Sequence, residues 1–254
     1  MPFDRNRNYV NWNPWHGCTK VSEGCRHCYV YRQDAMRDSA LDSSSVHRNA
    51  DFDLPVRRNR RRAWKIPAGS VVFTCFTSDF LLEEADCWRA EAWDMIRMRR
   101  DLIFYFFTKR IERFAEVVPE DWGDGWDNVA IAVSCENQEM ADLRLPILLD
   151  AKIRHKLIFV APILEYVELD GYLKSGQIEQ VAVGGESYAG ARTCDFDWVR
   201  GIREVCLKNN VVFDFHQTGS NFVKDGRRYY IKHRDEHSQA RKGMIYLDDL
   251  DKKQ

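Results

Sequence analysis

Residues 101–138 are DLIFYFFTKRIERFAEVVPEDWGDGWDNVAIAVSCENQ and contain two apolar runs of strand length. The first run, Asp101–Phe107, is rich in aromatic residues, and the second, Asn128–Val133, alternates β-branched residues with alanine. Between them, Ile111–Val118 has the length of a short helix and stops at Pro119. Two strands that are apolar throughout and are joined through a helix are typical of a parallel sheet with both faces covered.

The same alternation of apolar runs and helical patterns extends over most of the 254 residues. Five further runs are expected to be strands: Tyr9–Trp12, Ser70–Phe76, Lys156–Ala161, Gln180–Val183 and Val211–Phe215. Helices are expected at Tyr29–Ser39, Trp88–Arg100, Met140–Asp150 and Phe196–Asn209. This pattern predicts an α/β fold, either an open doubly wound sheet or a partial (β/α) TIM-type barrel. We favour the partial barrel, because the loop after the first strand would then join the other loops at one mouth.

Polar residues follow the expected strands at their carboxyl ends, where the loops of a barrel meet and its chemistry lies. The candidate binding residues there are Ser78, Asp79, Lys109, Arg110, Ser134, Glu136, Gly184, Gly185, Glu186, His216 and Gln217. Lys109 and Arg110 can hold a carboxylate or phosphate, and a surface ion pair is the alternative. The Gly184–Gly185 pair permits close approach of a ligand or makes a tight turn, and Asp79 is equally suited to capping a helix.

A cysteine-rich loop is expected directly after the first strand, in NWNPWHGCTKVSEGCRHCYVY at residues 11–31. Six residues separate Cys18 from Cys25, and two residues separate Cys25 from Cys28. Three thiolates can hold a four-iron cluster and leave one iron open, or they can hold zinc with His16 or His27 as the fourth ligand. Buried free thiols are the third alternative. The spacing alone does not separate a cluster from zinc.

Composition limits where the chain works and what it binds. The net charge is −1, and no apolar run approaches the roughly 18 residues of a membrane span. Eight cysteines scattered over a long chain do not resemble a secreted disulfide framework, so a reducing cytoplasm is expected. Because the net charge is close to zero, any affinity for nucleic acid must be local.

Two segments stand apart from the barrel pattern. We expect residues 1–219 to form the partial barrel and residues 220–254 to form a basic C-terminal extension. Residues 42–69 are expected to be an irregular, arginine-rich insertion. Its arginines, interleaved with Trp64, suit phosphate contacts and base stacking on a nucleic acid, or they form only a solvated surface.

Together these elements resemble the phage-associated three-Cys-motif family, which is largely uncharacterised and similar to radical S-adenosylmethionine enzymes. The resemblance covers about Trp12 to Gly219 and is carried by Trp12-Asn13-Pro14, Gly17-Cys18, Gly24–Tyr29, Ser78-Asp79, Thr108-Lys109-Arg110, Val133-Ser134, Glu136-Asn137-Gln138, Gly184–Ser187, Ala191-Arg192, Gln217 and Gly219. It implies a radical-SAM-like partial barrel with a 4Fe-4S cluster on Cys18, Cys25 and Cys28 and S-adenosyl-L-methionine on the open iron. It further implies an electron donor protein and a 5′-deoxyadenosyl radical that abstracts hydrogen from a substrate.

The resemblance also implies roles for the strand-end residues. His27 would lie near the adenine of the cofactor, and Ser78 and Asp79 would lie near its amino group. The other residues that it places at the cofactor are Ser134, Glu136, Gly184, Gly185 and Glu186. The substrate candidates are Lys109, Arg110, His216 and Gln217.

Two positions depart from the family pattern. Ala161 precedes Pro162 where the family usually has Glu, and His216 precedes Gln217 where it usually has Lys. The loss of a carboxylate and the exchange of a permanent cation for a titratable imidazole should alter substrate binding. We therefore expect a radical S-adenosylmethionine enzyme of unknown substrate, with a nucleic acid or nucleotide as one candidate. The alternatives are a zinc-stabilised nucleic-acid-binding module and a catalytically degenerate barrel.

Overall fold

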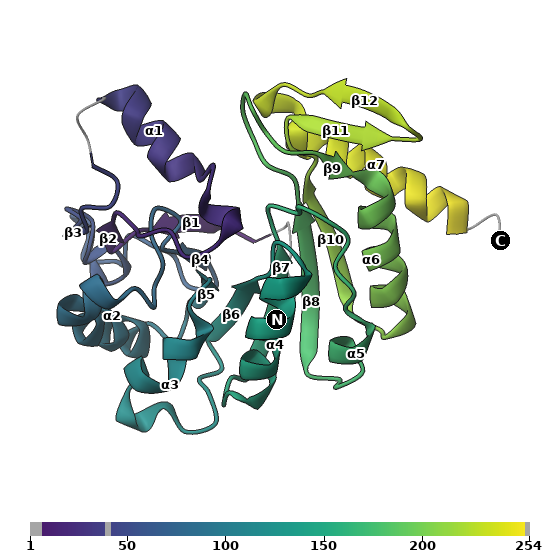
Figure 1. Cartoon of the computed structure of the whole chain (residues 1–254). Coiled ribbons are helices and arrows are strands. Elements are labelled where there is room, and N and C mark those ends of the chain that lie inside the picture. Colours follow the sequence, from purple (N-terminus) through teal and green to yellow (C-terminus); the bar gives the residue numbers. More distant parts are fainter. Residues whose placement is uncertain (1–6, 39–41, 252–254) are drawn as a thin grey trace.

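The computed structural model describes residues 7–38 and 42–251, and its centre is a seven-stranded parallel sheet (Figure 1). The strands are β1 (Tyr9–Trp12), β4 (Val71–Thr74), β5 (Ile103–Thr108), β6 (Val129–Ser134), β7 (His155–Val160), β8 (Ile178–Gly184) and β10 (Val212–Gln217). Each expected strand is confirmed, with ends that differ from the expected ones by no more than two residues.

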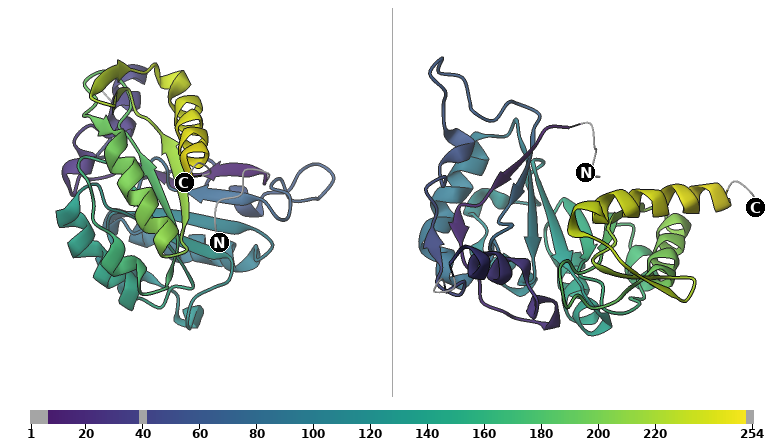
Figure 2. Two further views of the ribbon diagram at one scale, coloured as in Figure 1. Left: turned by 90° about the vertical axis from the view of Figure 1, so that its right-hand side faces the viewer. Right: turned by 90° about the horizontal axis from the view of Figure 1, so that it is seen from above.

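The order of the strands separates the two architectures that the sequence left open. A doubly wound sheet reverses its strand order once, whereas here the order is β1-β4-β5-β6-β7-β8-β10, the order of the chain. Each right-handed crossover therefore adds its strand on the same side, and the connecting helices collect on one face. The sheet twists and curls into a half-barrel flanked by helices (Figure 2). The expected partial barrel is thus confirmed as a mixed α/β half-barrel.

The helices on the convex face of the half-barrel are α2 (Asp86–Met98), α3 (Phe114–Val117), α4 (Gln138–Asp150), α5 (Asp170–Leu173) and α6 (Phe196–Lys208). α4 begins after Asn137, whose side chain accepts a hydrogen bond from the Met140 N–H at 3.0 Å, and it continues through Pro146. α1 (Tyr29–Arg37) follows the cysteine loop. Ser39, the expected end of that helix, lies outside the described residues.

Alternate strand residues point to opposite faces of the sheet and build two apolar clusters. The larger cluster lies between the sheet and the helices and includes Phe104 and Val181. The smaller cluster lies on the concave face and includes Tyr105 and Leu157. One face of the sheet therefore carries the core, and the other face is left to line a cavity.

The insertion and the C-terminal segment are more regular than the sequence indicates. Within the insertion, β3 (His47–Arg48) pairs antiparallel with β2 (Trp15–His16), so residues 42–69 are not wholly irregular. The C-terminal segment begins with a hairpin, β11 (Asn221–Lys224) and β12 (Arg227–Tyr230), and β11 pairs parallel with β9 (Cys194–Asp195).

The chain then continues as α7 (Glu236–Asp251), which lies along β10 and buries Ala240 and Leu247 (Figure 1). The described C-terminal segment is therefore packed onto the half-barrel. Single turns of 3-10 helix complete the chain: η1 (Glu23–Cys25), η2 (Leu54–Val56), η3 (Glu83–Ala85), η4 (Ile111–Arg113), η5 (Glu120–Trp122) and η6 (His233–Asp235). None of the helices in the described ranges combines the length and apolarity that crossing a bilayer requires.

Candidate functional site

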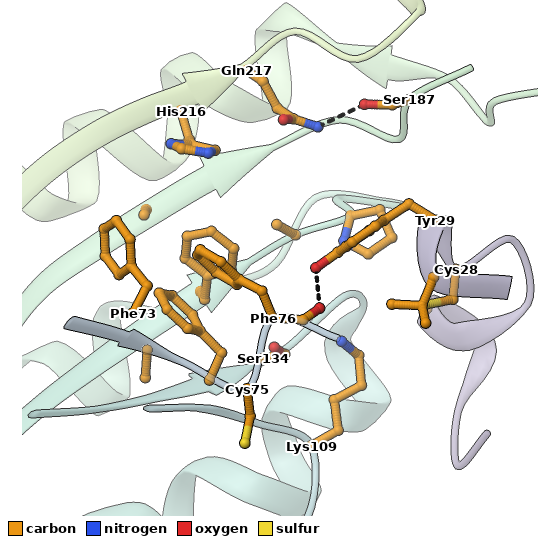
Figure 3. A pocket seen from close by; sticks show the side chains of 18 of the residues that line it. Cys28, Tyr29, Phe73, Cys75, Phe76, Lys109, Ser134, Ser187, His216 and Gln217 are labelled. Carbon is orange, nitrogen blue, oxygen red and sulfur yellow. Dashed lines mark hydrogen bonds between the residues drawn. The ribbon is translucent and has the colours of Figure 1, made fainter. Parts of the chain in front are cut away.

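A cavity of about 690 Å³ opens on the concave face and reaches the carboxyl ends of the strands (Figure 3). Small-molecule sites typically measure roughly 300–1,000 Å³. All but Glu136 and Gly184 of the predicted site residues line it: Cys18, Cys25, His27, Cys28, Ser78, Asp79, Lys109, Arg110, Ser134, Gly185, Glu186, His216 and Gln217. The structure therefore brings together residues from both ends of the chain, as a common barrel mouth requires.

The three cysteines of the loop stand at one side of this cavity. Cys25 ends the turn η1, and Cys28 is the N-cap of α1. Burial raises the pKa of Cys18 to about 12, and the nearby Cys25 adds to the rise. Burial also raises the pKa of Cys28, although the Val30 N–H at the start of α1 opposes the rise. Metal binding at these sulfurs would therefore release protons.

Gly17 lets the loop turn back just before Cys18. Its φ is +93°, and a Cβ there would lie 2.6 Å from the Ser45 carbonyl oxygen, so only glycine fits. The Gly17 carbonyl accepts a hydrogen bond from Ser78 Oγ at 2.5 Å, and the Cys18 N–H donates to the Ser43 carbonyl at 2.9 Å. Ser78 thus holds the backbone beside Cys18.

Arg110, which follows β5, holds the same end of the loop. Its guanidinium donates to the Thr19 carbonyl at 2.7 Å and lies 3.6 Å from Cys18 Sγ. Asp79 pairs with this guanidinium at 3.2 Å and also accepts the Thr108 hydroxyl at 2.8 Å. Asp79 is 4 % exposed and Arg110 is 6 % exposed. Both side chains position the cysteine loop and have little capacity left for a ligand.

Glu136, which follows β6, holds the middle of the loop. Its Oε1 accepts the Gly24 N–H at 3.1 Å, and its Oε2 lies 3.0 Å from Arg144 Nη1. A Cβ on Gly24 would lie 2.8 Å from Glu136 Cδ. Burial would raise the pKa of this carboxyl, but the charges of Lys109 and Arg144 bring it below its ordinary value. Glu136 is 0 % exposed, so it is an ionised anchor behind the loop and does not face the cavity.

Glu186, which follows β8, holds the far end of the loop. Its Oε2 lies 3.2 Å from His27 Nδ1, and its Oε1 accepts a hydrogen bond from Arg192 Nη2 at 2.8 Å. Arg192 Nη1 in turn donates to Glu23 Oε1 at 2.8 Å. Burial would raise the pKa of Glu186, but the hydrogen bonds from Arg192 lower it. Glu186 therefore connects the end of β8 to both sides of Cys25.

The close approach of two strand ends explains why glycine occurs at position 185 in the Gly184–Gly185 pair. A Cβ on Gly185 would lie 2.2 Å from the Thr218 carbonyl oxygen, because the ends of β8 and β10 meet there. Gly184 is the last residue of β8 and lies outside the cavity lining. Gln217 closes the same contact by donating to the Gly185 carbonyl at 2.7 Å. This geometry favours the tight-turn interpretation of the pair.

Lys109 differs from its paired neighbours. Within the described ranges its ammonium takes part in no hydrogen bond and no ion pair, although it lines the cavity and acts electrostatically on Cys28. Figure 3 shows this side chain between Cys28 and Phe76. Farther along the cavity, His216 packs against His237 with ring centroids 4.7 Å apart. A cation beside the cysteines and an imidazole opposite them are the side chains best placed to meet an anionic guest.

Sequence reasoning missed the aromatic wall of the cavity. Phe73, Phe76, Phe107 and Phe159 follow one another with successive ring centroids 5.1 Å apart, and all four line the cavity. The signal was present in the sequence, because the aromatic residues of the strand at 103–108 fall on both faces. The wall excludes water from the side of the cavity that faces the sheet.

The three thiols are the donor set that either a four-iron cluster or a zinc ion would use. Among residues 7–38 and 42–251, no three His, Cys, Asp or Glu side chains converge closely enough to hold one metal ion. A four-iron cluster takes its thiolates on separate irons and so spreads them over a larger body. Cys18, Cys25 and Cys28 supply three sulfurs beside a cavity that has room for a small molecule.

The two histidines considered as a fourth zinc ligand have other partners. His16 Nε2 lies 2.9 Å from Asp34 Oδ2, and His16 is not part of the cavity lining. His27 pairs with Glu186 through Nδ1 and retains Nε2. A carboxylate that orients an imidazole in this way is also common behind metal-bound histidines, so zinc stays the alternative to the cluster.

Fold and site together define a half-barrel protein with a three-cysteine loop at the mouth of a deep cavity. The chain belongs to the family described as protein of unknown function DUF5131, which matches residues 8–247. No curated protein and no solved structure matches the chain. The family match extends over the half-barrel, the insertion and most of α7, so these parts belong to one conserved unit of sequence.

Proposed function

We propose that this protein is a radical S-adenosylmethionine enzyme that holds a 4Fe-4S cluster on Cys18, Cys25 and Cys28. The observation that carries the proposal is that Cys18, Cys25 and Cys28 line one cavity on a half-barrel and that Cys25 is near enough to both of the others to raise their pKa values. When bound, the cluster would supply the electron that cleaves S-adenosylmethionine to a 5′-deoxyadenosyl radical, which takes a hydrogen atom from a substrate.

The residues of the chain would contribute position and environment. Ser78, Arg110, Glu136 and Glu186 hold the loop at four points and so fix the backbone that carries the cysteines. The aromatic wall keeps water from a reactive intermediate. Lys109 is the cation best placed to orient a carboxylate or phosphate on the guest.

The substrate side of the proposal follows from the lining opposite the cysteines. Ala161 and His216, which depart from the resembled family, both lie in the lining. We infer that the substrate differs from that of the resembled family, with a nucleotide as one candidate. A cytoplasmic electron donor protein would be its partner.

The experiment is anaerobic reconstitution with iron and sulfide. The wild-type protein should take up about four irons and four sulfides and should release 5′-deoxyadenosine when it is reduced in the presence of S-adenosylmethionine. Separate Cys18→Ala, Cys25→Ala and Cys28→Ala variants should lose the iron. Cys87→Ala, which removes an exposed thiol on α2, is the matched control and should keep it. Undiminished iron in Cys25→Ala would overturn the proposal.

The two alternative functions, a zinc-binding module and a degenerate barrel, are each supported by one observation. The Glu186–His27 pair favours zinc, which would appear as one tightly held zinc per chain in protein purified without oxygen. Ala161 in the cavity lining favours a degenerate barrel, which would bind the cluster and form no 5′-deoxyadenosine. Metal analysis and product analysis of the same sample separate the three functions.

A further inference from the structure

Residues 57–65, RRNRRRAWK, are the most strongly charged segment outside the cavity, and we call them the arginine hairpin. They contain five arginines, one lysine and no acidic residue, whereas the whole chain has a net charge of −1. The proposed radical chemistry does not use this segment, because none of its residues lines the cavity. The concentration of positive charge in the arginine hairpin therefore needs a separate explanation.

The arginine hairpin is an ordered turn rather than an irregular loop. Arg58 and Trp64 form an antiparallel bridge, and the Asn59 N–H donates to the Ala63 carbonyl at 2.8 Å. The Asn59 side chain closes the tip by accepting the N–H groups of Arg61 at 2.9 Å and Ala63 at 3.2 Å. Arg62 completes the turn with a φ of +62°. The backbone of the tip is therefore held in one conformation.

The five arginines of the hairpin fall into a supporting group and an open group. Arg57 is neutralised by Asp51 at 2.6 Å and by Asp53 at 3.1 Å. Arg58 stacks on the Trp64 ring, with its guanidinium carbon 3.7 Å from the centroid, so it supports the hairpin.

The open group consists of Arg60, Arg61 and Arg62 at the tip. All three are exposed, and in the described part of the chain their guanidinium groups have no hydrogen-bond or ion-pair partner. Three unneutralised guanidinium groups at the end of this turn would repel a second copy of the hairpin. They would attract an anionic surface.

The hairpin also stands apart from the body of the protein. Figure 2 shows it in dark blue, projecting from the side of the molecule opposite α1. At its base, Arg99 at the end of α2 donates to the Ile66 carbonyl at 2.8 Å and fixes the direction of the projection. A narrow ribbon that projects in this way can enter a groove that the half-barrel itself could not enter.

We propose that the arginine hairpin is a binding site for double-stranded DNA, contacted through phosphates at a groove. The open cations are arginines, which bind phosphate oxygens in a planar, bidentate geometry. The major groove of B-form DNA is wide enough for a two-stranded ribbon, whereas that of an RNA duplex is deep and narrow. The site is independent of the proposed cluster chemistry.

Other anionic partners fit the segment less well. A single strand needs a free aromatic face for base stacking, but Trp64 lies between Arg58 and Arg99, whose guanidinium carbons are 3.7 Å and 4.8 Å from its centroid. A membrane surface favours apolar side chains that insert beside the cations, and the tip sequence Asn59–Ala63 offers none larger than alanine. The aromatic residue that suggested base stacking in the sequence is thus used inside the protein.

The test is fluorescence anisotropy of a labelled DNA duplex of about 20 base pairs over a salt series. Replacing Arg60, Arg61 and Arg62 together by alanine should weaken binding roughly tenfold or more at low salt and reduce the slope of log affinity against log salt by about 3. The triple Arg→Lys variant should retain most of the slope, because it keeps the charges.

The matched control replaces Lys152, Lys174 and Lys208 by alanine, which removes the same charge from the surface elsewhere. It should bind like the wild type, and circular dichroism should show that every variant is folded. Equal loss in the control, an unchanged triple alanine variant, or tighter binding to single strands, duplex RNA or anionic vesicles would each overturn the proposal. The Cys25→Ala variant should bind DNA normally, so failure of the cluster proposal would not be mistaken for failure of this one.

Discussion

The support behind the cysteine loop and the cavity in front of it are built in different ways. Behind and beside the loop, Asp79, Arg110, Glu136 and Glu186 are at most 6 % exposed, and each is tied by hydrogen bonds to the loop or to the network that holds it. In the cavity next to the cysteines, Lys109 has no hydrogen bond among the residues described. The comparison teaches that polar residues at strand ends divide into those that position a loop and those that meet a guest.

The largest loss of stability is expected when a residue that holds the loop is removed. Glu136→Ala would leave Arg144, which is 3 % exposed, without its carboxylate partner, and should lower the free energy of unfolding by about 3–5 kcal/mol. Chemical denaturation measures the change. Glu139→Ala, which removes an exposed carboxylate on α4, the helix that carries Arg144, is the control and should change stability by less than about 0.5 kcal/mol. Equal stabilities of the two variants would contradict the anchor role.

A smaller effect is expected from crowding the same contact. Gly24→Ala would bring a Cβ to 2.8 Å from Glu136 Cδ and should cost about 1–3 kcal/mol of unfolding free energy. It should also lower the iron content after reconstitution. Gly171→Ala, which meets open space on α5, should leave both quantities unchanged or slightly raise the stability. Full iron content in Gly24→Ala would show that the loop does not need this contact.

The carboxylate of Glu186, which pairs with Arg192 and His27, should also make the stability of the protein depend on pH. The pKa of Glu186 is lowered in the folded protein, so its stabilising effect is complete above the ordinary carboxyl pKa of about 4.3 and is lost as the pH falls through the lowered value. The difference in unfolding free energy between wild type and Glu186→Gln should therefore be largest near neutral pH and shrink in acid. Glu112→Gln, an exposed carboxyl, should show no such trend. A difference that grows in acid would contradict the pairing.

The smallest effect on the loop is expected at the open cation. Lys109→Met should lower the stability and the iron content only slightly, because the ammonium group makes no hydrogen bond to the loop and acts on Glu136 through its charge alone. The adjacent Arg110→Met should lose both, since it removes the contacts to Thr19 and Cys18. Iron analysis and denaturation of the pair measure the contrast. Equal losses of stability and iron in Lys109→Met and Arg110→Met would contradict the distinction between residues that hold the loop and a residue that faces the cavity.

The sequence was sufficient for the framework of the fold. Every strand of the half-barrel was visible as an apolar run, and the polar residues after the runs predicted one common mouth. The sequence could not show how these polar residues divide, because their partners are remote: Gly24 and Glu136 are separated by 112 positions, and His27 and Glu186 by 159. Glu136 and Gly184 were therefore expected at the cofactor, whereas neither lines the cavity.

The C-terminal segment shows the same limit. The basic residues after Tyr230 predicted a C-terminal extension, and the chain there forms α7, whose first residue, Glu236, is buried. The Glu236 carboxylate accepts hydrogen bonds from Ser187 and Ser220, both at 2.6 Å. Glu236 follows another acid, Asp235, and gives no local signal that it will be buried, because its partners come from the ends of other strands.

The most direct test of the central claim is electron paramagnetic resonance of the reduced, iron-loaded protein with and without S-adenosylmethionine. Three cysteines that leave one iron open predict a reduced 4Fe-4S signal that changes when S-adenosylmethionine is added, and the loss of that signal in Cys28→Ala. A signal that S-adenosylmethionine leaves unchanged, or zinc in place of iron in protein prepared without oxygen, would contradict the claim.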